Sequence, residues 1–147
     1  MVDMVKVKLV KTSIDLGVDS VHTPELVAKV MKDYMEEHCN TDRENMVVLG
    51  VDINFKIHAI HTLSIGDSRS MQFSMLEIFR VCLLSNSQGF FLAHNHPTGE
   101  VEPSDTDIET THVIQQGAKT MGLNMLDHII IGDREVYSMK VNGDLTD

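Results

Sequence analysis

Two histidines separated by one residue are the first feature of this sequence that could do chemistry. The segment AHNHP at 93–97 contains His94 and His96. If this segment ends a β-strand, the two side chains point to the same face and their Cα atoms lie roughly 6.6 Å apart. Two imidazoles can converge on one metal ion from that separation, above the apolar Phe90 and Leu92 of the same face. The pair alone is a weak signal, because surface or capping histidines are the common alternative.

A serine and an aspartate follow in the segment PSDTD at 103–107. Ser104 is a natural helix N-cap and Asp107 stands at the N3 position, so the two residues form a near-capping box. Asp107 also begins a helical stripe that is expected to face the sheet and that continues through Thr110, Ile114, Ala118 and Met121.

An inward-facing carboxylate at this position needs a partner, because a buried, unpaired carboxylate is costly. His94 and His96 would explain an inward-facing Asp107 if the three side chains share a cation. Two histidines and one carboxylate, with water in the fourth position, form a catalytic zinc arrangement.

The elements that must position these residues alternate between strand and helix patterns. Thr23 and Pro24 predict the start of the first helix, and a hairpin turn is expected at 52–54. We predict a single α/β domain, with a mixed β-sheet flanked by about three helices in two or three layers. The expected strands are 4–12, 44–52, 56–64, 89–96 and two segments within 125–139, and the expected helices are 24–38, 74–86 and 104–121.

Length and composition fit one globular domain that spans residues 1–147. The chain has 42% hydrophobic and 23% charged residues, and no apolar run approaches the ~20 residues of a membrane helix. The N-terminus lacks the apolar core of a signal peptide, so a cytoplasmic location is the expectation. Twelve basic against twenty-two acidic residues give a net charge of -10, which counts against direct nucleic-acid binding.

The two cysteines do not provide a second metal site. Cys39 and Cys82 lie far apart, and the chain has no CxxC motif. We interpret them as reduced thiols, with Cys82 in the core.

The order His94-x-His96-x7-Ser104-x2-Asp107 resembles the full signature of the JAMM (MPN-plus) metalloprotease family. The resemblance implies one zinc ion per chain, held by the two histidines and the aspartate. It also implies hydrolysis of an amide, peptide or isopeptide bond by metal-activated water.

The flanking segments narrow this resemblance to one branch of the family. HNHPTG at 94–99 and LDHIIIG at 126–132 resemble the RadC branch, the bacterial JAB domain, and the similarity runs from about 41 to 137. The implied fold is the MPN/JAB fold, which is related in build to the cytidine deaminases.

The family pattern also implies a catalytic glutamate on an early strand, and Glu44 matches its place. Glu44, Met46 and Val48 share one face of the expected strand, so a carboxylate begins an otherwise apolar row. A solvated acid at the end of a strand is the alternative interpretation. Glu77 is a competing candidate, which we interpret as a residue on the polar side of its helix.

The resemblance gives roles to two residues besides the metal ligands. Glu44 would accept the proton of the attacking water and deliver it to the leaving amine. Ser104 would donate a hydrogen bond to the oxyanion. For Asp127 and His128 a second-shell carboxylate or a structural role at the end of a strand stays open, and the structural role is favoured. The remaining histidines are interpreted as ordinary surface or strand residues: His22, His38, His58, His61 and His112.

Two other functional classes deserve comparison. A deaminase needs HxE and PCxxC motifs, which this chain lacks. The alternative that stays open is a non-enzymatic RadC-type module with a DNA-repair-associated or scaffold role. The expected partner of a hydrolase is a peptide or isopeptide substrate, without membrane attachment, and methionine-rich helix faces could pair in a homodimer.

Overall fold

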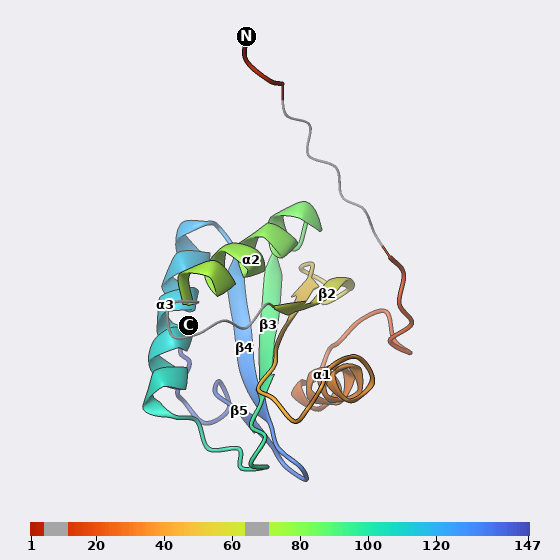
Figure 1. Ribbon diagram of the computed structural model, residues 1–147, viewed down its shortest axis with the longest axis vertical. Coiled ribbons are helices and arrows are strands. Elements are labelled where there is room, and N and C mark those ends of the chain that lie inside the picture. Colours follow the sequence, from red (N-terminus) through yellow and green to blue (C-terminus); the bar gives the residue numbers. More distant parts are fainter. Residues whose placement is uncertain (5–11, 64–70) are drawn as a thin grey trace.

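The chain folds into one α/β domain with a five-stranded mixed sheet and helices on both of its faces (Figure 1). The computed structural model describes residues 1–4, 12–63 and 71–147, with the backbone alone at 71–74. The strand predicted at 4–12 therefore falls outside the described residues except at its two ends. The elements are α1 (Pro24–His38), β1 (Met46–Val51), β2 (Ile57–Leu63), α2 (Met71–Leu84), β3 (Gly89–Asn95), α3 (Asp105–Thr120), β4 (Asn124–Ile131) and β5 (Val136–Ser138).

The strands lie in the order β2-β1-β3-β4-β5. β3 and β4 run parallel and are connected through α3, whereas the other neighbouring pairs are antiparallel. This arrangement confirms the predicted mixed sheet. β3 is the central strand, and all seven of its residues are buried. Its end is therefore held by a neighbouring strand on each side.

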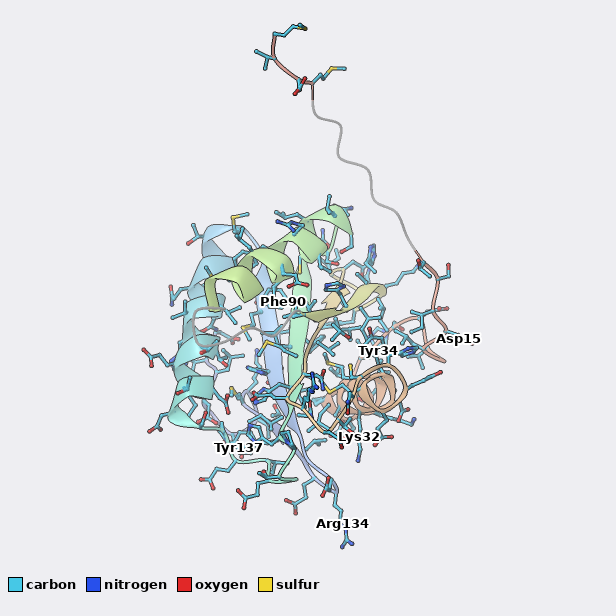
Figure 2. The ribbon with its side chains drawn as sticks, in the orientation of Figure 1. Asp15, Lys32, Tyr34, Phe90, Arg134 and Tyr137 are labelled. Carbon is cyan, nitrogen blue, oxygen red and sulfur yellow. The ribbon has the colours of Figure 1, made fainter. Side chains whose placement is uncertain are left out.

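Two hydrophobic clusters make the domain a three-layer structure. On one face of the sheet, Met31 and Met35 of α1 pack against alternate residues of β1, β3 and β4. On the other face, α2 and α3 cover a cluster that contains Phe90, Leu92 and Ile130. Figure 2 shows Phe90 between the sheet and these two helices. The period-2 pattern of β3 thus divides its side chains between two cores.

Local sequence explains where the helices begin. Thr23 accepts a hydrogen bond from the backbone N–H of Leu26, and Pro24 occupies the first turn of α1, where it displaces no helical hydrogen bond. Among the described residues, no helix is both long and apolar enough to cross a lipid bilayer.

The inward face of α3 differs by one position from the predicted stripe. Ile114 and Ala118 are buried as expected, but Thr111 is buried with them at 0% exposure. The prediction that Met121 faces the sheet is wrong, because this residue caps the helix C-terminus and is 46% exposed. The change brings Thr111 toward the sheet beside the end of β3.

Candidate metal centre

The end of β3 places two imidazoles on the face that α3 covers. His94 is the sixth residue of the strand and is fully buried, whereas His96 follows the strand end and is partly buried. Their Nε2 atoms lie 3.0 Å apart. The predicted convergence of the two side chains is confirmed, and it follows from the alternation of side chains along an extended chain.

The loop after β3 orients His96. The Nδ1–H group of His96 donates to the carbonyl oxygen of Glu100 at 3.0 Å. The loop turns at Gly99, whose φ of +83° favours glycine and whose N–H donates to the carbonyl oxygen of His96 at 2.9 Å. Because a carbonyl accepts only, Nδ1 carries the proton and the Nε2 lone pair of neutral His96 is directed toward His94.

The first turn of α3 supplies the carboxylate. Ser104 and Asp107 form a complete capping box: the Ser104 hydroxyl accepts from the Asp107 N–H, and Asp107 Oδ2 accepts from the Ser104 N–H at 2.9 Å. The same Oδ2 atom lies 3.2 Å from Nε2 of His96 and 3.5 Å from Nε2 of His94. Asp107 therefore caps the helix and faces the histidines at once.

The environment of Asp107 favours its charged form. Burial by itself raises the pKa of this carboxyl group. The close approach of His94 and the hydrogen bond from the Ser104 N–H outweigh burial and hold the pKa well below its ordinary value. A carboxylate rather than a carboxylic acid thus faces the two rings at neutral pH.

Glu44 lies at the open side of this group. Its Oε1 atom is 4.0 Å from Nε2 of His94, and 52% of its side chain is exposed. The residue precedes β1 rather than beginning it, because the strand starts at Met46 and not at the predicted residue 44. We call Glu44, His94, His96 and Asp107 the metal cluster.

Asn95 holds the segment that carries Glu44, a role that the sequence analysis missed. Its Oδ1 accepts from the Asn45 N–H at 2.7 Å, and its Nδ2 donates to the carbonyl oxygen of Arg43 at 2.9 Å. The residue between the two histidines thus fixes the backbone on both sides of Glu44. A polar residue at a buried position in β3 was the available signal.

A third histidine lies directly behind His94. The Nε2 atom of His128, in β4, is 2.7 Å from Nδ1 of His94, and its Nδ1 atom is 2.6 Å from the hydroxyl oxygen of Thr111. His128 is 1% exposed, and burial, reinforced by the neighbouring His94, lowers its pKa well below the ordinary value. The sequence favoured a structural role at the end of a strand for His128, but its ring contacts His94 of the metal cluster instead.

Asp127 has the structural role that was favoured for it. Its carboxylate accepts from the hydroxyl of Ser138 and from the backbone N–H groups of His128 and Lys140. Burial raises the pKa of Asp127 although these three donors oppose the shift. The side chain therefore joins β4 to the segment after β5.

The donor atoms of the metal cluster fit a single divalent ion. All four lie within 4.8 Å of one another. Ligands about 2.0–2.1 Å from a tetrahedral ion are separated by about 3.3 Å. The three separations among His94, His96 and Asp107 are 3.0, 3.2 and 3.5 Å. Two nitrogen lone pairs and a carboxylate at these distances can hold a cation between them.

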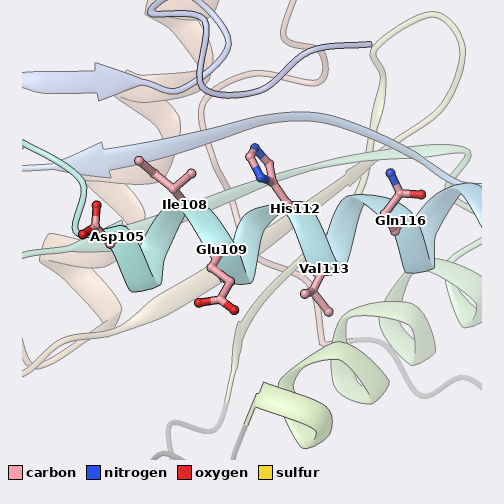
Figure 3. Close-up of a pocket in the computed structure, with 6 residues that line it drawn as sticks. All are labelled: Asp105, Ile108, Glu109, His112, Val113 and Gln116. Carbon is pink, nitrogen blue, oxygen red and sulfur yellow. The ribbon is translucent and has the colours of Figure 1, made fainter.

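Other candidate residues lie elsewhere. Glu77, the competing candidate for the catalytic glutamate, lies away from the metal cluster on α2, where it contacts Nε2 of His61 in β2 at 2.8 Å. His112 lies on α3 beside Glu109 and Val113, along a depression of about 490 Å³ (Figure 3), and contacts the carbonyl oxygen of Asp144 at 2.7 Å. Cys82 is a buried free thiol as predicted, and burial raises its pKa to about 12.

Comparison with known proteins identifies the family to which this chain is similar. The model of the RadC-like JAB domain matches residues 21–144. A UPF0758 protein of Desulfitobacterium hafniense is 33% identical over 140 residues, which cover 90% of this chain and 62% of that protein. A UPF0758 protein of Halalkalibacterium halodurans is 35% identical over 125 residues, or 85% of this chain and 53% of the relative. One from Thermotoga maritima is 28% identical over 150 residues, or 98% of this chain and 68% of the relative.

The chain belongs to the RadC-like JAB domain family. It spans 62% and 53% of the length of the first two relatives described above. The family resemblance predicted from the signature is thereby confirmed.

Proposed function

We propose that this chain is a zinc-dependent hydrolase of amide, peptide or isopeptide bonds. His94, His96 and Asp107 would hold one zinc ion per chain. The observation that carries the proposal is the convergence of two histidine Nε2 atoms and a carboxylate oxygen at 3.0–3.5 Å. When bound, zinc would supply an activated water and a Lewis acid for the scissile carbonyl.

Glu44 is the proposed general base. Its carboxylate is close to the ligands, but at 4.0 Å from His94 it stands apart from the three closest donors. That position leaves it free to accept a proton from the attacking water and to return it to the leaving nitrogen. Its 52% exposure puts it at the rim, where an incoming substrate meets it first.

Ser104 is the proposed oxyanion donor. Its hydroxyl oxygen accepts from the Asp107 N–H at 3.0 Å, and the hydroxyl proton takes no part in that bond. The residue is exposed beside the cluster. The hydroxyl can therefore donate to negative charge that develops on a carbonyl oxygen bound at the site.

Zinc content and hydrolysis test the proposal together. The protein is purified without chelator or His-tag, loaded with zinc, and assayed against peptide amides and lysine isopeptides. We expect Glu44→Gln to keep its zinc and to lose a factor of ~10²–10⁴ in rate, the usual contribution of a general base. The matched control is Glu100→Gln, since Glu100 is also exposed and contacts His96 through its backbone carbonyl only.

The outcomes separate the two functional classes. Equal loss of activity in Glu44→Gln and Glu100→Gln would contradict the role of Glu44. A wild-type protein that binds zinc and cleaves none of the substrates would instead support a non-enzymatic module. Absence of zinc after loading would contradict the proposed metal site itself.

A further inference from the structure

A chain of three buried hydrogen bonds runs from the backbone of α3 to the metal cluster. The Thr111 hydroxyl contacts the carbonyl oxygen of Asp107 at 2.6 Å and Nδ1 of His128 at 2.6 Å. Nε2 of His128 contacts Nδ1 of His94 at 2.7 Å. Thr111, His128 and His94 are 0%, 1% and 0% exposed, so no water competes for these groups at the surface.

The directions of these hydrogen bonds follow from the first one. A carbonyl oxygen only accepts, so the single hydroxyl proton of Thr111 is donated to Asp107. Toward His128 the hydroxyl oxygen must then accept, which places the proton of His128 on Nδ1.

The same reasoning continues to the ligand. A neutral imidazole has one N–H group, so Nε2 of His128 offers a lone pair and accepts from Nδ1–H of His94. His94 thereby keeps its Nε2 lone pair, and this atom lies 3.0 Å from His96 Nε2 and 3.5 Å from Asp107 Oδ2. In the other tautomer, an N–H group would point to the place where a metal binds.

We propose that Thr111 and His128 are positioning residues that fix the tautomer of His94, so that its Nε2 lone pair faces the metal cluster before any metal arrives. The inference deepens the proposed function and rests on it for the identity of the ligands. We call the hydrogen-bonded chain from the Asp107 carbonyl through Thr111 and His128 to His94 the relay. Because it begins at Asp107 and ends at His94, the relay also connects two proposed ligands from different elements, α3 and β3.

Substitution of Thr111 should reverse the relay. In Thr111→Val a methyl group replaces the hydroxyl, and the Nδ1–H group of His128 loses its acceptor. A buried donor without a partner is costly, so His128 should move its proton to Nε2 and donate to His94. His94 would then carry its proton on Nε2. Thr111→Ser keeps the hydroxyl, and Thr110→Val makes the same change one residue earlier on α3.

The first readout is the tautomer in the metal-free protein. Long-range ¹H–¹⁵N spectra of histidine-labelled protein distinguish protonated from unprotonated ring nitrogens at mildly alkaline pH. We expect Nδ1–H in both His94 and His128 for the wild type, Thr111→Ser and Thr110→Val, and a shift to Nε2–H in Thr111→Val. Wild-type spectra with His94 protonated on Nε2 would overturn the proposal, even if Thr111→Val failed to fold.

The second readout is zinc affinity, measured by competition with a chromophoric chelator. Thr111→Val should bind zinc ~10–100-fold more weakly than the wild type, as is typical when a group that orients a metal ligand is lost. Thr111→Ser should restore most of the affinity, and Thr110→Val should match the wild type. If the wild type binds zinc and Thr111→Val binds it equally well, the relay is wrong while the hydrolase proposal stands. If the wild type binds no zinc, the hydrolase proposal fails, and the spectra still decide the tautomer.

Discussion

Among the described residues, two regions bring histidines to carboxylates that are not their sequence neighbours, and one of the two gathers enough donors to hold a metal. The first region is the metal cluster at the end of β3. The second consists of two separate pairs beside β2, which we call the β2 pairs: His58 with Asp52 at 3.2 Å and His61 with Glu77 at 2.8 Å. Within the described part of the chain, the metal cluster is the one group of three or more such side chains that converge.

Spacing along the strand accounts for part of the difference. His94 and His96 are two residues apart at the end of a central strand, so their rings meet. His58 and His61 are three residues apart on the edge strand β2, and each meets a different carboxylate. A cavity of about 1040 Å³ lies beside the β2 pairs, so a large hollow by itself does not mark the group of candidate metal ligands.

The second nitrogen of each ring accounts for the rest. Nδ1 of His96 is bound to a backbone carbonyl and Nδ1 of His94 to His128, which leaves Nε2 of both rings for the cluster. Both ring nitrogens of His58 face acceptor oxygens, those of Ser85 and Asp52. A histidine near a carboxylate can thus serve as a metal ligand only if one ring nitrogen keeps a lone pair that points to the place where other donor atoms converge.

Removal of ligands gives the largest expected contrast between the two regions. His94→Ala and Asp107→Ala should reduce zinc from about one ion per chain to almost none, with affinity lower by more than ~100-fold. His58→Ala and His61→Ala remove the same ring from the β2 pairs and should leave the zinc content unchanged. Elemental analysis after zinc loading measures both sets. Loss of zinc in His58→Ala or His61→Ala would contradict the claim that the metal cluster alone of the two regions binds the ion.

Loss of the Ser104 hydroxyl should act on rate rather than on zinc. Ser104→Ala should lower hydrolysis by a factor of ~10²–10³, the usual cost of one oxyanion donor. It should also cost about 1 kcal/mol of stability, because Ser104 caps α3. Ser104→Thr keeps the hydroxyl and should retain both properties. A rate in Ser104→Ala equal to that of Ser104→Thr would leave the residue with its capping role alone.

Crowding of the loop that orients His96 should weaken the metal cluster from a distance. A Cβ atom at Gly132 would lie 2.4 Å from the carbonyl oxygen of Gly99 and 2.6 Å from Val101. Gly132→Ala should therefore cost ~1–3 kcal/mol of unfolding free energy in urea and should lower zinc affinity as well.

Gly122→Ala is the matched control for this change. Gly122 has a φ of +74° and nothing within 4 Å of the added Cβ, so it should lose ~1–2 kcal/mol through backbone strain alone. Its zinc affinity should stay that of the wild type. Equal zinc affinity in Gly132→Ala would show that the loop position does not matter.

The smallest expected effect is a pH dependence in the β2 pairs. Desolvation raises the pKa of Asp52, but hydrogen bonds from the N–H groups of Lys56 and Asn54 and from His58 lower it below its ordinary value. A depressed carboxyl pKa contributes stability above the unfolded value of about 3.9, and this contribution is lost as the pH falls through the folded pKa. Asp52→Asn should be less stable than the wild type near neutral pH, and urea unfolding in acid should show the two converging. A gap that stays constant across this range would exclude the charge as its cause.

The sequence predicted the elements and the convergence of the candidate metal ligands because both depend on local patterns. Side-chain alternation placed His94 and His96 together, and the capping box placed Asp107 at the start of α3. Each is a relation among residues a few positions apart. The choice of Glu44 as the catalytic glutamate depended on the family pattern. From the strand pattern alone, an acid at the start of an apolar row could equally be a solvated residue at the end of the strand.

Interactions between distant segments were harder to predict. Helical periodicity assigned Glu77 to the polar side of its helix, and only the packing of α2 against β2 gives it His61 as a partner. Met121 was assigned to the inward stripe of α3, whereas the helix ends there and exposes it. Helical periodicity gives the face of a residue within its helix, but not what lies opposite that face.

The sequence by itself determined the α/β fold and the spacing of the three candidate ligands, because side-chain alternation and helix capping act within a few residues. Only the tertiary structure decided that His128 stands behind His94. The parallel pairing of β3 and β4 contains an irregularity between Phe90 and Phe91, after which His128 lies opposite Leu92. Without that shift, His128 would lie opposite Ala93 and face α1 instead, because one residue of slip moves a strand's side chains to the other face. The candidate ligands follow from patterns a few residues long. The tautomer that leaves a lone pair on Nε2 of His94 depends instead on how the strands β3 and β4 pair.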